Sequence, residues 1–174
     1  MCDREQGSKV SFAKIPTGAE REAYLHLLLL ADESEIQVRA SMNNGTLYAY
    51  WTGDDSAPAG IILATPDSDE TVELKAVAVA SERQGQGIGT QMMRAVLDDL
   101  RDLNVRRVTV GTGNAGIGQL AFYQKAGFRL RHIERDYFTP ERGYPADLSE
   151  NGIPLRDMVW MDLEFASASD SQPR

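Results

Sequence analysis

The residues with the clearest chemical potential form a glycine-rich turn at positions 83–90, with the sequence Arg-Gln-Gly-Gln-Gly-Ile-Gly-Thr. The turn lies between a predicted strand and a long predicted amphipathic helix. Glycine allows a positive φ and a close approach of the backbone to a ligand, so successive N–H groups can point inward at the positive end of the helix dipole. The segment therefore predicts a binding site for a pyrophosphate.

Three phosphate-binding patterns compete for this turn. A P-loop nucleoside triphosphatase requires a lysine followed by Ser or Thr after the last glycine, and Gly89-Thr90 lacks that lysine. A dinucleotide-binding fingerprint requires Gly or Ala at position 90 and an acidic residue at the end of the next strand, but Thr90 and Thr112 stand there. The third pattern, Gln/Arg-x-x-Gly-x-Gly/Ala, is matched in full by Gln84, Gly87 and Gly89.

This third pattern resembles the acyl-CoA pyrophosphate loop of the GNAT family of N-acetyltransferases. The resemblance extends over residues 47–128 and includes Glu-Leu-Lys-Ala-Val-Ala-Val at 73–79 and Asn114 followed by Ala-Phe-Tyr-Gln-Lys-Ala-Gly-Phe at 121–128. Residues 151–158 also resemble the approach to the last strand in a subgroup of bacterial GNAT-like proteins. The resemblance implies an enzyme that transfers the acetyl group of its co-substrate, acetyl-CoA, directly to a primary amine of a small molecule or peptide through a ternary complex.

The resemblance also implies roles for individual residues. Tyr123 is expected to be the general acid for the departing thiolate, and Glu73 the base that takes the amine proton directly or through water. A backbone N–H near Val77 is expected to polarise the thioester carbonyl. The implied cofactor contacts are Val77, Ala78, Val79, Gln84, Gly85, Gln86, Gly87, Ile88, Gly89, Thr90, Asn114 and Tyr123.

Each of these roles has an alternative. Tyr123 could be a packed helix tyrosine with its hydroxyl in water, and Glu73 a surface glutamate paired with Lys75, in which case water serves as the base. Asn114 could cap the helix that follows it, either instead of or in addition to contacting the cofactor. The alternative for the whole chain is a non-catalytic GNAT-like domain that senses acyl-CoA or binds a partner.

A long irregular stretch at residues 134–156 separates the last two predicted strands. It is too long for a simple hairpin loop. It carries aromatic and acidic side chains, a combination that suits an amine bearing apolar groups. The stretch is either one wall of the acceptor site or a solvated loop with a few packed aromatics. The side chains in question are Tyr137, Phe138, Tyr144, Asp147 and Glu150.

Hydrophobic periodicity predicts the elements that position these residues. Thr17 and Glu20 have the spacing of a capping box, so a buried helix is expected to start near Thr17. The longest helix follows Gly89, where apolar side chains recur at helical spacing as far as Leu103. Strands are expected only after the turn at residues 43–45. Further helices are predicted at 35–40 and 117–126, and strands at 47–51, 60–64, 71–79, 107–112, 128–133 and 157–165.

The fold class follows from these elements and from the resemblance. A strand-helix-strand order around the long helix predicts a parallel pair that holds Val77 and Val110. The resemblance implies an α/β (α+β) GNAT fold, with a mixed central sheet of about six to seven strands splayed between the fourth and fifth strands and flanked by about four helices. Residues 1–166 are expected to form a single domain, and the polar tail 167–174 to be disordered.

The composition of the chain limits the kinds of molecule that it is expected to bind. The net charge of −8 opposes binding to nucleic acid phosphates, and no apolar run is long enough to span a bilayer. The polar N-terminus lacks the pattern of a secretory signal, so a cytoplasmic location is the default expectation. The single cysteine, Cys2, and the two histidines, His26 and His132, form no recognisable metal-ligating set. The resemblance adds a homodimer as a possible assembly.

Overall fold

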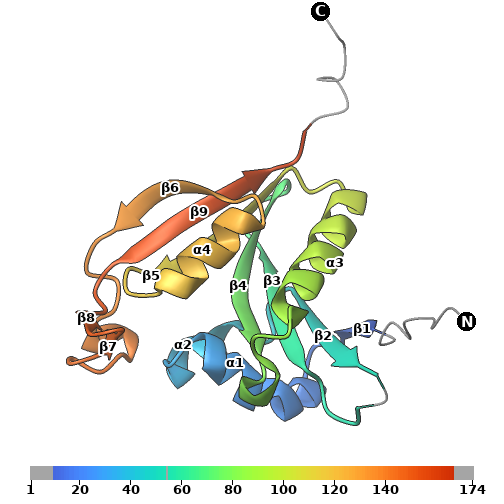
Figure 1. Cartoon of the computed structure of the whole chain (residues 1–174), viewed down its shortest axis with the longest axis horizontal. Coiled ribbons are helices and arrows are strands. Elements are labelled where there is room, and N and C mark those ends of the chain that lie inside the picture. The colour runs from blue at the N-terminus through green and yellow to red at the C-terminus, as the bar shows by residue number, and fades with distance from the viewer. Residues whose placement is uncertain (1–9, 54, 167–174) are drawn as a thin grey trace, which may run out of the picture.

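The centre of the structure, a computed structural model that describes residues 10–53 and 55–166, is a mixed seven-stranded sheet (Figure 1). Cys2 and the tail at 167–174 lie outside the described residues. The strand order is β1-β2-β3-β4-β5-β9-β6, and β7 pairs with β8 in a separate sheet. The strands are β1 (Val10–Ile15), β2 (Thr46–Thr52), β3 (Gly60–Pro66), β4 (Thr71–Val79), β5 (Arg107–Gly113), β6 (Arg129–Glu134), β7 (Ser149–Glu150), β8 (Ile153–Pro154) and β9 (Met158–Glu164).

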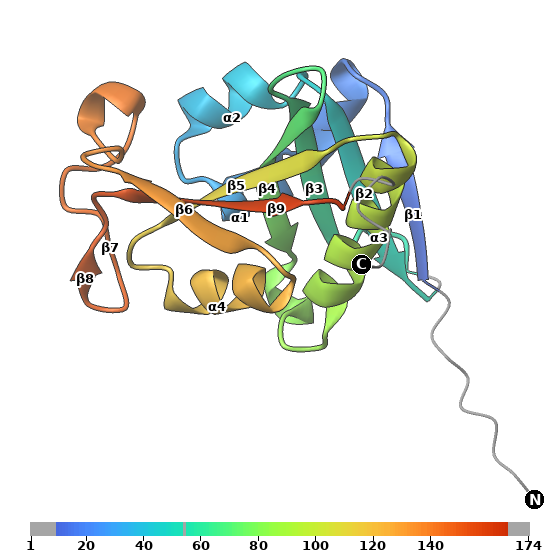
Figure 2. The ribbon, with the colours of Figure 1, turned by 90° about the horizontal axis from the view of Figure 1, so that it is seen from above.

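Helices cover both faces of this sheet. Figure 2 shows α3 and α4 on one face and α2 on the other, and the buried contacts of α1 place it on the same face as α2. Within the described residues, the arrangement confirms the predicted α/β class, with its mixed sheet and four helices. The helices are α1 (Leu25–Ala31), α2 (Glu35–Ser41), α3 (Ile88–Asp102) and α4 (Ile117–Lys125), and short 3-10 turns lie at Ala19–Tyr24, Ser81–Arg83 and Pro140–Arg142.

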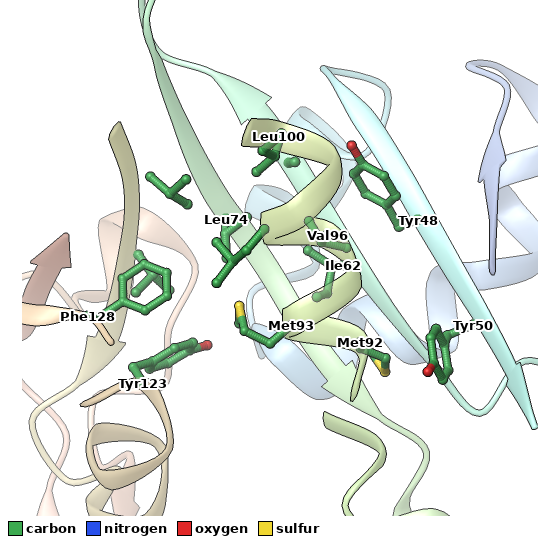
Figure 3. Close-up of a cluster of buried hydrophobic side chains, with 14 of the residues drawn as sticks. Tyr48, Tyr50, Ile62, Leu74, Met92, Met93, Val96, Leu100, Tyr123 and Phe128 are labelled. Atoms are coloured by element: carbon green, nitrogen blue, oxygen red, sulfur yellow. The ribbon is translucent and has the colours of Figure 1, made fainter. Parts of the chain in front are cut away.

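Strand β3 is buried on both faces because a helical layer lies on each side of it. Ile62 packs with Met92 of α3 in one hydrophobic cluster (Figure 3), which we call the α3 cluster. Ile61 and Leu63 pack with Leu27 of α1 in a second cluster, which we call the α1 cluster. A strand covered on both faces has an uninterrupted apolar sequence, as residues 60–64 do.

The first strand departs from the prediction. The sequence pattern predicts no strand before the turn at residues 43–45, but β1 pairs antiparallel with β2, from Val10 opposite Thr52 to Ile15 opposite Leu47. Residues 11–14 are exposed, so this edge strand has no buried stripe that would create a hydrophobic period. Its conformation is defined by backbone pairing to β2.

The first helix also starts later than predicted. The capping box expected at Thr17 is wrong, because the residue that precedes the 3-10 turn is Gly18, at φ 111°, which makes no side-chain cap. The α-helix itself begins at Leu25. The physical reason is Arg21, a buried arginine in the 3-10 turn whose side chain bonds to backbone carbonyl groups of the residues before the helix.

The guanidinium group of Arg21 is enclosed by backbone carbonyl groups. Nε donates to the carbonyl of Pro16 at 3.1 Å, and Nη1 donates to that of Met42 at 2.6 Å. Nη2 donates to the carbonyls of Ile15 at 3.0 Å and Gly45 at 2.9 Å. These bonds join the end of β1, the 3-10 turn and the loop before β2, so a single side chain organises the amino-terminal third of the fold.

No helix in the described residues combines the length and apolar character needed to cross a bilayer. The same part of the chain contains no group of three or more His, Cys, Asp or Glu side chains arranged to hold a metal ion. His132, which is exposed on β6, stacks on Trp160 with ring centroids 6.2 Å apart.

Candidate active site

The sheet opens where β4 and β5 part. The two strands pair in parallel from Thr71 opposite Arg107 to Leu74 opposite Val110 and no further. Beyond that point β4 continues to Val79 beside β3, and β5 continues beside β9. The predicted splay between the fourth and fifth strands is therefore present, and it leaves one edge of β4 without a partner strand.

A β-bulge lies at the start of this splay. In the β3–β4 ladder Ala64 is opposite Leu74 but Leu63 is opposite Ala76, so Lys75 is the extra residue. A bulge reverses the side to which later side chains point. Leu74 accordingly lies in the α3 cluster, while Ala76 lies in the α1 cluster. By alternation Glu73 points toward the face that carries α1.

A cavity of about 260 Å³ occupies the splay. It is lined from both faces of the sheet, because its walls come from α4 on one side and from the α1–α2 connection on the other. The predicted acid and base, Tyr123 and Glu73, both line it. The other lining residues are Leu30, Ala31, Asp32, Glu33, Leu74, Lys75, Ala76, Val77, Gly111, Thr112, Gly113, Gln119, Tyr137, Phe138, Tyr144, Leu148, Glu150, Leu155, Met158 and Trp160.

Tyr123 lies on α4 at the inner wall of the cavity. Its side chain is only 7% exposed, and its ring packs at right angles to those of Phe122 and Phe128, with centroids 5.2 and 5.8 Å away. Figure 3 shows its hydroxyl pointing away from Phe128. The hydroxyl hydrogen-bonds to no group in the described part of the chain. Burial raises the pKa of Tyr123 above its usual value of 10.0, so the phenol is protonated at neutral pH.

Glu73 lies on β4, half-buried and paired with a lysine. Nζ of Lys75 lies 3.3 Å from Oε1 of Glu73, and both side chains line the cavity. The ion pair proposed as the alternative to a catalytic role is thus present. The pairing does not remove Glu73 from the site, because its second oxygen, Oε2, makes no hydrogen bond within the described residues. Lys75 holds the carboxylate in place at the splay.

The unpaired edge of β4 presents backbone groups to the gap. The N–H of Ala80 donates to the carbonyl of Ala59, which continues the β3 side of the ladder. Backbone groups alternate in direction along a strand, so those of Val79 and Val77 point away from β3 toward the gap. Those of Ala78, which was predicted to contact the cofactor arm as well, point toward β3. Within the described residues, the strand edge thus offers the gap both backbone groups of Val77 and the N–H of Val79, since the Val79 carbonyl accepts from Gln84.

The glycine-rich turn forms an open anion cradle at the start of α3. Gly85 and Gly87 adopt φ values of 74° and 77°, and a Cβ at either position would meet no atom within 4 Å. Gly87 precedes the first helical turn and no side chain caps it. Among the described residues, the backbone N–H groups of residues 85–90 donate to no acceptor. Three of them, those of Ile88, Gly89 and Thr90, belong to the first turn of α3. Unpaired amides at the N-terminus of a 15-residue helix favour an anion.

The two glutamines of the turn act through their side chains within the protein. Nε2 of Gln84 donates to the carbonyl of Val79 at 3.2 Å, and Nε2 of Gln86 donates to that of Glu82 at 3.3 Å. The first contact ties the turn to the end of β4, next to the gap. The side chains of both glutamines therefore stabilise the loop. What the loop offers to an anion comes from its backbone N–H groups.

Asn114 has a structural role that the sequence analysis did not predict. Its Oδ1 accepts hydrogen bonds from the N–H groups of Arg156 and Asp157, and its Nδ2 donates to the carbonyl of Pro154. The alternative of a helix cap is wrong, because Gly116 precedes α4 and no side chain caps it. Asn114 therefore anchors the chain before β9 to the end of β5, and its predicted contact to the cofactor stays a prediction.

The irregular stretch at residues 134–156 forms one wall of the cavity. Tyr137, Phe138, Tyr144 and Glu150 line it, whereas Asp147 does not. The stretch is fixed to the α1–α2 connection because Ser34 Oγ donates to the carbonyl of Arg142 at 2.9 Å. The stretch therefore packs against the cavity, and its role as a wall of the acceptor site stays a prediction.

Two acidic residues of the cavity were not predicted as site residues. Asp32 and Glu33 precede α2, where the sequence suggests capping oxygens, and Ser34 is the actual cap through a contact to the Gln37 N–H. The signal that could have identified them is that one capping residue suffices for one helix, so the two neighbouring carboxylates are not needed as caps.

Comparisons with known proteins identify the family of the chain. The model of the acetyltransferase (GNAT) family matches residues 11–128. The uncharacterized N-acetyltransferase YvbK of Bacillus subtilis is 38% identical over 153 residues, which cover 87% of this chain and 96% of that protein.

Solved structures extend the match to the whole fold. An acetyltransferase of Bacillus subtilis in complex with CoA has a TM-score of 0.80 and 35% identity, and the match covers 91% of this chain and all of that one. A GNAT family acetyltransferase from Elizabethkingia anophelis with acetyl-CoA bound has a TM-score of 0.80 and 33% identity, with 90% and 98% of the two chains covered. The chain therefore belongs to the GNAT family of acetyltransferases, and the prediction of an enzyme with acetyl-CoA as its co-substrate is confirmed.

Proposed function

We propose that the chain transfers the acetyl group of acetyl-CoA directly to a primary amine of a small molecule, within a ternary complex. The observation that carries this proposal is the cavity at the splay, which is open to both faces of the sheet and holds Tyr123 on the α4 side and Glu73 on the α1 side. Donor and acceptor can then approach from opposite faces and meet between these two side chains.

The donor side is supported by the free backbone groups. The N–H groups of residues 85–90 would hold the pyrophosphate, and the exposed backbone edge at Val77 and Val79 would hold the pantetheine arm as an added strand. Acetyl-CoA supplies an acetyl group already activated as a thioester. The Val77 N–H would donate to the thioester oxygen, where negative charge develops in the transition state.

The two side chains act at different atoms of the reaction. Glu73 takes a proton from the acceptor nitrogen, since an ammonium group has no lone pair for attack. As the N–C bond forms and the C–S bond breaks, the nitrogen loses its second proton to solvent. The Tyr123 hydroxyl donates a hydrogen bond to the departing thiolate sulfur, which then takes a proton from solvent. The products are the acetylated amine and the CoA thiol.

Release of free thiol from acetyl-CoA tests this proposal. We expect thiol release that depends on an added primary amine, with one acetyl group in the amine for each thiol formed, as mass spectrometry would show. If acetyl-CoA raises the melting temperature but no amine gives turnover, the proposal fails and the sensor alternative replaces it.

Replacing Glu73 with Gln is expected to lower kcat about a hundredfold at neutral pH, because the variant cannot accept the amine proton. The defect should shrink as the pH approaches about 10, where an alkyl ammonium loses its proton to solvent and needs no base. A pH profile of kcat for both proteins measures this.

The matched control for this variant is Glu70→Gln. Glu70 pairs with the exposed Arg106 at 3.2 Å outside the cavity, so that variant should retain the wild-type profile. Equal kcat values for wild type and Glu73→Gln at neutral pH would instead assign the base role to water.

A further inference from the structure

The cavity carries more negative charge than a single amine requires. Four carboxylate side chains line it, and Lys75 is the only cationic side chain among the described lining residues. Lys75 pairs with Glu73. The other three carboxylates, Asp32, Glu33 and Glu150, take part in no ion pair within the described residues. A ligand with one amino group would leave most of this charge unbalanced.

Asp32 is held in a defined position before any ligand arrives. Its Oδ1 accepts from the N–H of Ser34 at 2.9 Å, and its Oδ2 accepts from the hydroxyl of Tyr144 at 3.2 Å. Tyr144 is buried, and burial, with the nearby charge of Asp32 as a further cause, raises its pKa, so its hydroxyl stays a donor. A carboxylate fixed in this way binds a cation with little loss of side-chain entropy.

Aromatic rings stand beside these carboxylates. The rings of Phe138 and Tyr144 lie 4.9 Å apart at a steep angle, and Tyr137 lies 5.1 Å from Phe138. Arg142, which pairs with Glu134, lies over the Tyr137 ring, 4.2 Å from its centroid. Aromatic faces bind ammonium groups and pack against methylene chains.

The opposite wall identifies the reacting end. The Tyr123 side chain is more than nine-tenths buried, lines the cavity, and has a hydroxyl without a partner in the described residues. Glu150, on β7, lies beside α4, because Nε2 of Gln119 donates a hydrogen bond to its Oε1 at 3.4 Å. The cavity thus has a reacting end at Tyr123 and Glu73 and an acidic, aromatic end at the α1–α2 connection.

We infer that the acceptor is a small aliphatic compound with at least two amino groups, one of which is acetylated while Asp32 and the neighbouring aromatic rings bind a second, charged one. This inference rests on the proposed function. The volume of about 260 Å³ suits a short diamine or polyamine chain.

The test compares diaminobutane with butylamine, which has the same carbon chain and one amino group fewer. We expect kcat/KM for the diamine to exceed that for the monoamine by about tenfold to a hundredfold, the effect of one charge-assisted contact. Asp32→Asn should remove most of this preference, measured as the ratio of kcat/KM for the diamine to kcat/KM for butylamine. Glu150→Gln should reduce the preference to a smaller extent.

Asp147→Asn is the matched control, because Asp147 lies in the same wall segment but does not line the cavity. Equal kcat/KM for the two amines would overturn the inference and leave the proposed function intact. An Asp32→Asn variant that weakens both substrates equally would also overturn it, since that result indicates a structural role. Absence of thiol release with every amine would overturn the proposed function itself, and the inference with it.

Discussion

Replacing Tyr123 with Phe is expected to lower kcat about a hundredfold while leaving the affinity for acetyl-CoA nearly unchanged. The substitution removes one oxygen atom from a well-packed ring, so the contacts to Phe122 and Phe128 remain. What disappears is the hydroxyl that donates to the departing sulfur. Rates with a saturating amine, together with the rise in melting temperature that acetyl-CoA produces, measure the two parts separately.

The expected size of this effect follows from the pKa of the buried phenol. An ordinary thiol has a pKa of about 8.5, below that of a buried tyrosine, so complete proton transfer to the thiolate is unfavourable. The hydroxyl then acts chiefly by a hydrogen bond to a charged sulfur, worth about 1.5–3 kcal/mol, or roughly tenfold to a hundredfold in rate. The estimate of a hundredfold is therefore near the lower end for a general acid.

The direction of the pKa shift also predicts the alkaline side of the profile. Burial raises the pKa of Tyr123 above 10.0, so its proton is present throughout the neutral range. Deprotonation of Tyr123 should therefore not lower the wild-type kcat at any pH below about 10. The prediction is contradicted if the wild-type kcat declines with a midpoint below about pH 9 and the kcat of Tyr123→Phe does not. Tyr123 would then lose its proton at a lower pH than its burial implies.

Tyr50→Phe provides the control for a lost hydroxyl. Tyr50 is also a buried tyrosine of the α3 cluster, and its hydroxyl donates to Gln91 at 3.4 Å outside the cavity. We expect kcat in this variant to stay within about twofold of wild type. A comparable loss in both variants would indicate a general packing defect.

Replacing Arg21 with Met is expected to destabilise the fold by about 3 kcal/mol or more. Arg21 is 1% exposed, and four backbone carbonyl groups lose their donors when the guanidinium is removed. Each buried acceptor left without a partner costs about 1–3 kcal/mol, partly offset where water can reach it. Urea unfolding should show a lower midpoint with an unchanged slope.

Arg39→Met is the control for this variant. Arg39 is an exposed arginine that bonds to Glu35 and Glu22, and exposed ion pairs contribute about 0–1 kcal/mol. A loss for Arg21→Met no larger than that for Arg39→Met would show that the carbonyl contacts do not hold the amino-terminal segments together.

The strongest sequence signals are those with a local cause. The αL glycines, the helix after them and the stop at Gly127 all follow from backbone conformation and side-chain spacing over a few residues. Strand β4 was predicted at residues 71–79 and is observed as Thr71–Val79. In contrast, β1 has no local signal, because an exposed edge strand is formed by its partner.

The amino-acid sequence by itself determined the family, and it pointed to the glycine-rich turn at residues 85–90 and to the candidate acid and base, because each of these depends on short spacings along the chain. Only the tertiary structure brought Asp32, Glu150 and Tyr123 to one cavity and gave Asn114 its anchoring role. It also showed that the bulge at Lys75 places Ala76 on the α1 face of the sheet. These features join segments that are distant in sequence, and such contacts arise from strand register and chain packing, which local spacing does not encode.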